Sequence, residues 1–171
     1  MKDDYDLSQL RTKGKRKNSR TKGNTFERQI AKLLNDRFQT TEFSRSPGSG
    51  AFATTHNLPD HLKIYGDLIT PQKFKYCIEC KKGYNNLNLY SLYNYRSEFW
   101  KFIEQCEKDS KKCNKIPMVI FKQDRQPTLA IIPQEVTVTE SIKYIDIHKN
   151  KTYRVYLFEE LIKCWDSMWF D

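Results

Sequence analysis

The sequence has no long apolar run, no disulfide framework and no internal repeat, and each absence argues against a class of protein. No segment approaches the roughly 20 apolar residues that span a bilayer, and no signal-peptide core follows the N-terminus. The 5 cysteines are an odd number without disulfide-type spacing, so we expect free thiols in a reducing compartment. We therefore expect a cytoplasmic protein that does not act at a membrane.

A structural zinc site is not expected either. Cys77 and Cys80 have the Cys-x-x-Cys spacing, but residues three positions apart in a strand face opposite sides and cannot chelate one ion. Cys106 and Cys113 are seven positions apart on a predicted helix, which separates them by about two turns. We interpret all of these residues as free thiols.

Acidic residues are missing from one stretch in particular. The chain as a whole carries 30 Lys and Arg against 21 Asp and Glu, a net charge of +9, which predicts a polyanionic partner. Between Arg11 and Lys22 there are seven basic residues and no acidic one, and almost nothing apolar that could be buried. We expect residues 1–22 to form a disordered arm that contacts phosphates without sequence preference. The alternative is a tail that only solubilises the chain.

Hydrophobic periodicity predicts the order of the structural elements. Apolar residues at helical spacing predict helices over residues 24–38 and 97–112. A closing helix from about residue 158 is expected to carry Trp165 and Trp169 in the core. Strands are expected near residues 67–69, 74–81, 118–121, 129–132, 136–138, 142–147 and 152–156. This order predicts an α/β fold with a mixed central β-sheet flanked by helices.

Asp67 and the tripeptide Glu79-Cys80-Lys81 form the pattern with the clearest chemistry. Side chains alternate along a strand, so Glu79 and Lys81 share a face. If the strand of Asp67 pairs with the next, two carboxylates and one ammonium converge. Such a trio suits metal-assisted phosphodiester hydrolysis, because hard oxygen ligands hold Mg²⁺ and the cations offset phosphate charge. An ordinary amphipathic strand can also carry Glu-x-Lys as a surface ion pair, so the pattern alone leaves both interpretations open.

The wider series of motifs resembles the PD-(D/E)XK nuclease superfamily, and within it the archaeal and phage-type Holliday-junction resolvases. The motifs are Lys22-Gly23 with Phe26-Glu27-Arg28, then Arg45-Ser46-Pro47-Gly48-Ser49, Gly66-Asp67 and Glu79-Cys80-Lys81. The similarity covers roughly residues 22 to 133. The chain departs from the pattern with Gly66 in place of proline and with about 17 residues between Ser49 and Asp67. We therefore expect a nuclease core over residues 23–133, with residues 134–171 adding strands and a helix packed on it.

The resemblance implies a restriction-endonuclease-like core and a set of site residues. Asp67, Glu79 and the Cys80 carbonyl would hold Mg²⁺ or Mn²⁺, and Glu27 would reach the metal directly or through water. Lys81 would touch the nucleophile or the phosphate. Glu27 could instead form a capping box with Asn24, three residues before it. The candidate DNA contacts are Arg16, Lys17, Arg20, Lys22, Arg28, Arg45, Ser46, Ser49, Lys82 and Lys122.

The function expected from these features is that of a Mg²⁺-dependent, structure-selective DNA endonuclease, with the four-way junction as the preferred substrate. The resemblance implies a homodimer that cuts two strands symmetrically, in the cytoplasm of a microbe or a phage-infected cell. A nickase, a restriction-type endonuclease or an exonuclease would keep the same fold. A non-catalytic nucleic-acid-binding protein and a basic structural protein are further alternatives, but neither explains the complete Asp67, Glu79 and Lys81 set.

Overall fold

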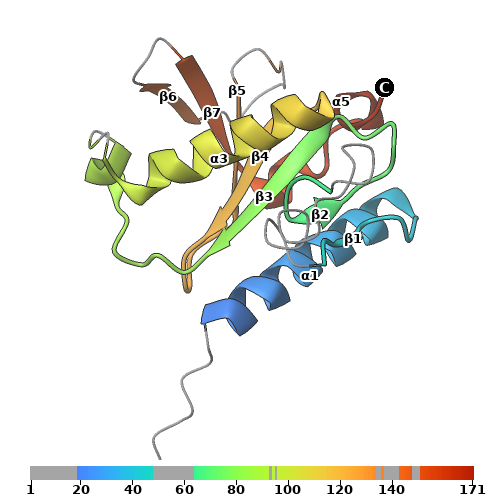
Figure 1. Cartoon of the computed structure of the whole chain (residues 1–171), viewed down its shortest axis with the longest axis horizontal. Coiled ribbons are helices and arrows are strands. Elements are labelled where there is room, and N and C mark those ends of the chain that lie inside the picture. The colour runs from blue at the N-terminus through green and yellow to red at the C-terminus, as the bar shows by residue number, and fades with distance from the viewer. Residues whose placement is uncertain are drawn as a thin grey trace, which may run out of the picture.

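The computed structural model describes residues 19–47, 64–92, 94, 96–133, 136, 143–147 and 151–171 (Figure 1). No helix in these ranges is long and apolar enough to cross a membrane. The elements in chain order are α1 (Ser19–Phe38), β1 (Ser44–Arg45), β2 (Leu68–Ile69), β3 (Tyr76–Lys82), η3 (Leu89–Leu92), α3 (Glu98–Cys113), β4 (Ile116–Lys122), β5 (Leu129–Pro133), β6 (Lys143–Ile147), β7 (Lys151–Leu157), α4 (Phe158–Leu161) and α5 (Asp166–Trp169).

A five-stranded mixed sheet forms the centre of the fold. Its strand order is β3-β4-β5-β7-β6. Strands β3 and β4 are parallel, joined by the crossover helix α3, and the other neighbours are antiparallel. The short strands β1 and β2 pair antiparallel beside β3. The predicted α/β fold with a mixed, helix-flanked sheet is thereby confirmed.

Alternation along the strands produces two apolar layers, one on each face of the sheet. On one face Ile78, Met118 and Ile120 pack with the buried α1 stripe. On the other face Val119 and Phe121 pack against α3. Figure 1 shows α3 crossing β3 and β4, with α1 beside β1 and β2. Glu79 alternates with Ile78 along β3, so its side chain lies on the α3 face of the sheet. Strand β3 is at the edge of the sheet, and this outer edge lies next to β2.

Helix α1 begins at Ser19, so the expected start at Asn24 is wrong. Once residues 26–34 pack on the sheet, each further turn adds hydrogen bonds at little cost, and the polar residues preceding them can stay helical in water. Asn24 is therefore an interior helical residue, and the capping-box interpretation of Glu27 is wrong as well. Residues 19–22 of the predicted arm are helical, while residues 1–18 lie outside the described part of the chain, where the arm stays a prediction.

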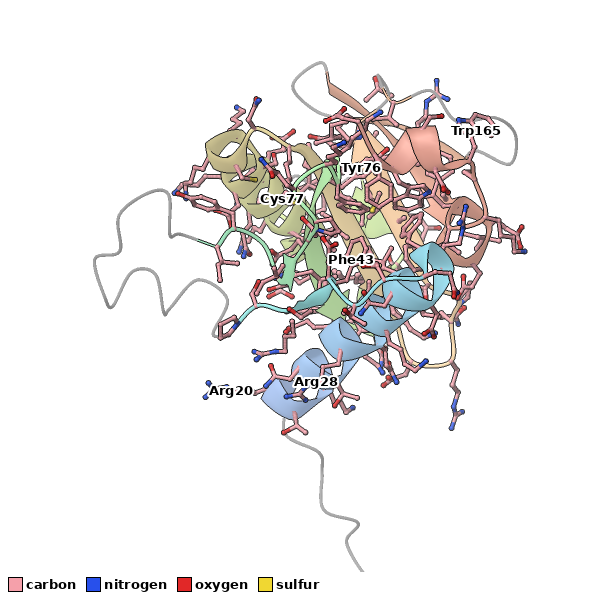
Figure 2. The ribbon with its side chains drawn as sticks, turned by 90° about the vertical axis from the view of Figure 1, so that its right-hand side faces the viewer. Arg20, Arg28, Phe43, Tyr76, Cys77 and Trp165 are labelled. Carbon is pink, nitrogen blue, oxygen red and sulfur yellow. The ribbon has the colours of Figure 1, made fainter. Side chains whose placement is uncertain are left out.

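The C-terminal segment forms two short helices, α4 and α5, where the periodicity predicted one. Arg37 of α1 donates hydrogen bonds to the Ile162 and Cys164 carbonyls, both at 2.9 Å, and so satisfies acceptors that the break leaves free. The interruption separates the two tryptophans. Trp169 is fully buried, whereas Trp165 is 53% exposed at the periphery (Figure 2), which corrects the expectation that both lie in the core.

Two strand predictions also change in detail. The strand expected over residues 74–81 begins at Tyr76, and Phe74 instead forms an isolated bridge with Phe170. Val136 lies in a bend, and the rest of the strand predicted at 136–138 falls outside the described residues. The predicted helix over 97–112 and the antiparallel partnership of the strands at 118–121 and 129–132 are confirmed.

Candidate metal and catalytic site

Asp67 is held against the outer edge of β3 by two hydrogen bonds. Its backbone N–H donates to the Ile78 carbonyl at 2.8 Å, and its Oδ2 accepts from the Cys80 N–H, also at 2.8 Å. Even-numbered residues of β3 therefore direct their backbone groups toward Asp67, because the N–H and C=O of one strand residue project to the same side. The Cys80 carbonyl consequently points to the edge where the Asp67 carboxylate lies.

Gly66 explains how the chain can approach β3 so closely. Its φ is +77°, and a Cβ at this position would lie 2.7 Å from the Ile78 carbonyl oxygen. Proline is restricted to φ near −65° and has no place here. The departure from the Pro-Asp pattern is thus a requirement of this backbone, and glycine is the residue that satisfies it.

Three buried carboxylates gather at this edge. The exposed fractions are 7% for Glu27, 5% for Asp67 and 2% for Glu79. Arg45 Nε donates to Glu27 Oε2 at 2.6 Å, and Lys81 forms an ion pair with Glu79. Glu27 comes from α1, Asp67 from the segment before β2 and Glu79 from β3, so the fold joins residues that are distant in the sequence.

The site has three carboxylates, but among the described residues only two cations, Arg45 and Lys81, pair with them. Burial, and then the Asp67 charge, raise the pKa of Glu79 to about 7. The same two causes raise the pKa of Glu27, and the Arg45 partnership only partly offsets them. Removing charged oxygen from water costs free energy unless positive charge compensates it. The donor set of clustered carboxylate oxygens with excess negative charge therefore fits a hard divalent cation.

The carboxylates are each engaged by a protein donor in this structure. Within the described ranges, no three His, Cys, Asp or Glu side chains are arranged as a ready-made metal cluster. The contacts account for this, because Glu27 is turned to Arg45, Asp67 to the Cys80 amide and Glu79 to Lys81. A cation would have to exchange with some of these donors.

Lys81 is positioned by α3 as well as by Glu79. Burial alone would lower its pKa, but the Glu79 and Asp67 charges outweigh burial and raise the pKa of Lys81, so it stays protonated. Its Nζ lies 5.4 Å from the Phe102 ring centroid and 3.5 Å from Gln105 Oε1. No motif in the sequence marks Phe102 and Gln105 as site residues. Their i, i+3 spacing on α3 shows only that they share a helix face, not that this face meets Lys81.

Arg45 and Ser46, two of the candidate DNA contacts, lie largely buried beside the carboxylates of the site. The Arg45 side chain is 20% exposed, and besides Glu27 it bonds Asn24 Oδ1 at 3.0 Å. Ser46 is 2% exposed and its N–H donates to the Asp67 carbonyl at 2.9 Å. Its buried hydroxyl has no hydrogen-bond partner among the described residues. Both residues thus support the placement of Glu27 and Asp67.

The remaining candidate DNA contacts fall into two groups. Arg20, Lys22 and Arg28 are exposed on the N-terminal half of α1, and Figure 2 shows Arg20 and Arg28 there. Lys82 and Lys122, at the ends of β3 and β4, are half-buried. The predicted contacts at Arg16, Lys17 and Ser49 lie outside the described residues.

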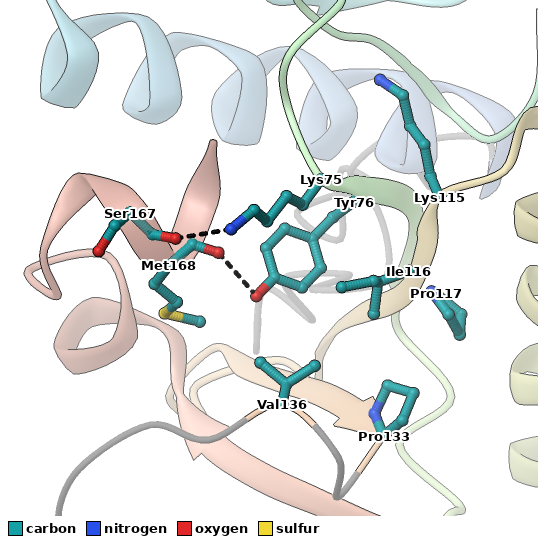
Figure 3. Close-up of a pocket in the computed structure, with 9 residues that line it drawn as sticks. All are labelled: Lys75, Tyr76, Lys115, Ile116, Pro117, Pro133, Val136, Ser167 and Met168. Atoms are coloured by element: carbon teal, nitrogen blue, oxygen red, sulfur yellow. Dashed lines mark hydrogen bonds between the residues drawn. The ribbon is translucent and has the colours of Figure 1, made fainter. Parts of the chain in front are cut away.

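A cavity of about 510 Å³ lies at the other end of β3 and β4 (Figure 3). Tyr76 donates to the Met168 carbonyl at 3.1 Å and Lys75 to the Ser167 carbonyl at 2.8 Å. Its lining is largely apolar and includes no carboxylate side chain. It does not have the donor chemistry of the Asp67 edge, and we assign it no part in the reaction.

The comparison with protein families agrees with this geometry. The family described as "Phage putative PDDEXK endonuclease" matches residues 18–168, which extend from the start of α1 into α5. The chain belongs to this family. The predicted membership of the PD-(D/E)XK superfamily is confirmed. Asp67 and Glu79-x-Lys81 match the D and (D/E)XK positions of that name, with Gly66 in place of the proline.

The chain is also similar in sequence to a curated phage protein. Protein D14 of Escherichia phage T5 is 37% identical over 113 residues, which are 63% of this chain. The match spans 66% of the length of that relative. No solved structure is significantly similar to the chain.

Proposed function

We propose that this nuclease-family chain is a divalent-metal-dependent endonuclease that hydrolyses phosphodiester bonds in DNA. The observation that carries the proposal is the convergence of Glu27, Asp67 and Glu79 with Lys81 at one strand edge. Buried carboxylates with an adjacent ammonium are not explained by stability alone. Replacing a buried ion pair with hydrophobic residues of similar volume often leaves the stability of a protein unchanged or raises it. A function that needs this charge explains why they are there.

The assignment of roles follows from the chemistry of each group. The carboxylates of Asp67 and Glu79 and the Cys80 carbonyl would hold Mg²⁺ or Mn²⁺, with Glu27 reaching it directly or through water. The bound ion would supply an activated water and offset charge on the phosphate. Lys81, held by Phe102 and Gln105, would donate hydrogen bonds to the attacking water or to a phosphate oxygen.

Arg45 has a supporting part in this proposal. It neutralises Glu27 in the free protein and fixes the direction of that side chain. Ser46, which follows it, ties β1 to the Asp67 backbone. We propose that these two residues position the acidic groups and do not themselves contact DNA.

The finer part of the proposal concerns the substrate. The sequence resemblance to Holliday-junction resolvases favours a four-way DNA junction, and the net charge of +9 suits a polyanion. Symmetric cutting of two strands needs two active sites, so we propose a homodimer whose two-fold axis matches that of the junction.

A cleavage assay tests the proposal. Labelled four-way junction, linear duplex and nicked duplex are each incubated with Mg²⁺, Mn²⁺ or EDTA. Wild type is compared with Asp67→Asn and Glu79→Gln, and with Glu42→Gln, which changes an exposed carboxylate outside the site. We expect both site variants to lose at least about 10³-fold in rate because the group fails as a unit. We expect the control to cut normally.

The products distinguish the alternatives. Paired symmetric cuts confined to the junction, and absent in EDTA, would support a resolvase. Cutting of every substrate would keep the endonuclease and reject the junction preference, and single cuts would indicate a nickase. Tight DNA binding without cutting under either metal would contradict catalysis and favour a non-catalytic binding protein.

A further inference from the structure

A cluster of cations surrounds Asp124 where three elements meet. Lys22 Nζ on α1 lies 3.9 Å from Asp124 Oδ2. The charges of Lys82, at the end of β3, and of Arg125, in the β4–β5 turn, also act on this carboxylate. A side-chain hydrogen bond from Asn85 is the largest cause that lowers the pKa of Asp124, followed by the Lys22 charge. We call Lys22, Lys82 and Arg125 the basic patch, with Asp124 at its centre.

The backbone beneath the basic patch is tied down by reciprocal hydrogen bonds. Asn85 Nδ2 donates to Asp124 Oδ2, and the Asp124 N–H donates back to Asn85 Oδ1, both at 3.0 Å. Gln123 Nε2 donates to the Tyr84 and Leu87 carbonyls at 2.9 and 2.6 Å. The segment after β3 and the β4–β5 turn therefore form one unit, which presents the patch in a fixed geometry.

The basic patch begins immediately beside the proposed metal site. Lys82 follows Lys81 in β3, and its Nζ lies 5.6 Å from the ring centroid of Phe26, the residue before Glu27. One residue of strand advances about 3.3 Å, and because side chains alternate, Lys82 projects to the α1 face while Lys81 projects to the α3 face. Lys22 lies four residues before Phe26, about 6 Å along α1. A nucleic-acid strand bound at the site would reach the patch within a nucleotide or two.

We propose that the basic patch binds the backbone phosphates of DNA next to the cleaved bond, and that Asp124 holds the place of a phosphate in the free protein. This inference rests on the proposed function, which puts a phosphodiester at Asp67, Glu79 and Lys81. Phosphate oxygens and a carboxylate make the same demand on lysine and arginine, namely charge-assisted hydrogen bonds. An incoming phosphate meets repulsion from Asp124, so Asp124 weakens DNA binding and releases the product strand more readily.

The proposal predicts opposite changes in DNA affinity for substitutions at neighbouring residues. Asp124→Asn keeps an oxygen that can accept from Asn85 but removes the charge, so we expect DNA to bind about 3- to 10-fold more tightly. Arg125→Asn should weaken binding by a similar factor; asparagine tolerates the left-handed backbone at φ 62°. Lys82→Gln should act in the same direction. Each lost phosphate contact should reduce the slope of log affinity against log salt by about 1.

The measurement is fluorescence anisotropy of the full chain with a labelled DNA duplex in EDTA, repeated over a salt series. Two matched controls change charge near the other end of α1: Glu159→Gln removes an exposed negative charge and Lys163→Gln an exposed positive one. If the control variants change the DNA affinity as much as the patch variants do, the effect comes from the net charge of the protein and the proposal is overturned. Unchanged binding by Asp124→Asn and Lys82→Gln would also overturn it, whether or not Arg125→Asn folds.

Two further outcomes separate this inference from the proposed function. Wild-type cleavage with unaltered binding in all patch variants would keep the nuclease and reject the patch. The expected binding changes in a chain that does not cut would keep the patch and reject catalysis. In a last experiment, polyglutamate is added as a competitor for the bound DNA. If it displaces DNA at equal charge concentration, the patch is a site for acidic protein, and the DNA assignment is wrong.

Discussion

At the scale of single residues, the backbone conformation of Gly66 gives a sharp prediction. Gly66→Ala should lower the free energy of unfolding by about 3 kcal/mol, since a left-handed backbone is unfavourable for alanine and its Cβ would meet the Ile78 carbonyl at 2.7 Å. Gly83→Ala is the matched control. Gly83 has φ +100° but nothing within 4 Å of the added Cβ, so about 1 kcal/mol is expected. Urea unfolding measures both, and equal losses would contradict the clash.

The cysteines are predicted to differ in reactivity. A hydrogen bond from Cys77 lowers the pKa of the half-exposed Cys113 to about 7, with help from the Lys115 charge. Burial raises the pKa of Cys80 and Cys106, and also that of Cys164. Iodoacetamide at about pH 7.5 should therefore alkylate Cys113 first, because the thiolate is the nucleophile.

Peptide mass spectrometry over a time course checks this order. Cys113→Ser should remove the fast phase of labelling, and Cys164→Ser should leave it in place. A fast phase that persists in Cys113→Ser would mean that the Cys77 hydrogen bond does not activate this thiol.

At the scale of elements, α1 is held on the sheet by one stripe of buried apolar side chains. Leu34 is fully buried and its neighbour Leu33 is 47% exposed. Leu34→Ala should reduce the free energy of unfolding by about 3 kcal/mol through lost burial and a cavity. Leu33→Ala should cost only about 0.5 kcal/mol. Chemical denaturation compares them, and similar losses would show that α1 packs with a different face.

The elements also show how far the sequence could be interpreted. The α1 stripe and the α3 stripe were found because their apolar side chains recur every three to four residues, whatever they pack against. The start of α1 was missed because Ser19 to Lys22 carry no apolar signal, and their helicity is propagated from the packed turns. The break between α4 and α5 was missed because the Arg37 contacts that stabilise it come from more than 120 residues away.

At the scale of the whole molecule, stability should respond to pH and metal together. The pKa of Glu79 is raised to about 7 in the folded protein, mainly by burial and then by Asp67. The folded state thus holds the Glu79 proton more tightly than the unfolded chain. This contribution favours folding at low pH and is lost as pH rises from the ordinary glutamate range to about 7. Above about pH 7 Glu79 is ionised, and the negative charges of the site outnumber the positive charges that pair with them.

Magnesium should therefore raise the melting temperature more at about pH 8 than at about pH 5.5, because the ion and the proton compete for the same carboxylate. Differential scanning fluorimetry with Mg²⁺ and with EDTA at both pH values measures this. Glu79→Gln should remove most of the magnesium effect, and Glu42→Gln should retain it. An equal magnesium effect at both pH values would contradict the assignment of Glu79 as a ligand.

The sequence by itself determined that Glu79 and Lys81 share a face of one strand and that Asp67 precedes them by a short turn. It also determined the mixed α/β class, because strand alternation and helical periodicity are local properties of the chain. The order of its motifs was sufficient to assign the superfamily, which the family comparison confirmed.

Only the tertiary structure decided which distant residues meet at the site. Arg45 pairs with Glu27 across 18 positions, and Gln105 approaches Lys81 across 24. Asp124 meets Lys22 and Asn85, which have no shared motif with it. Such pairings depend on how α1, α3 and the β4–β5 turn are placed around β3, and no local period in the sequence records that placement.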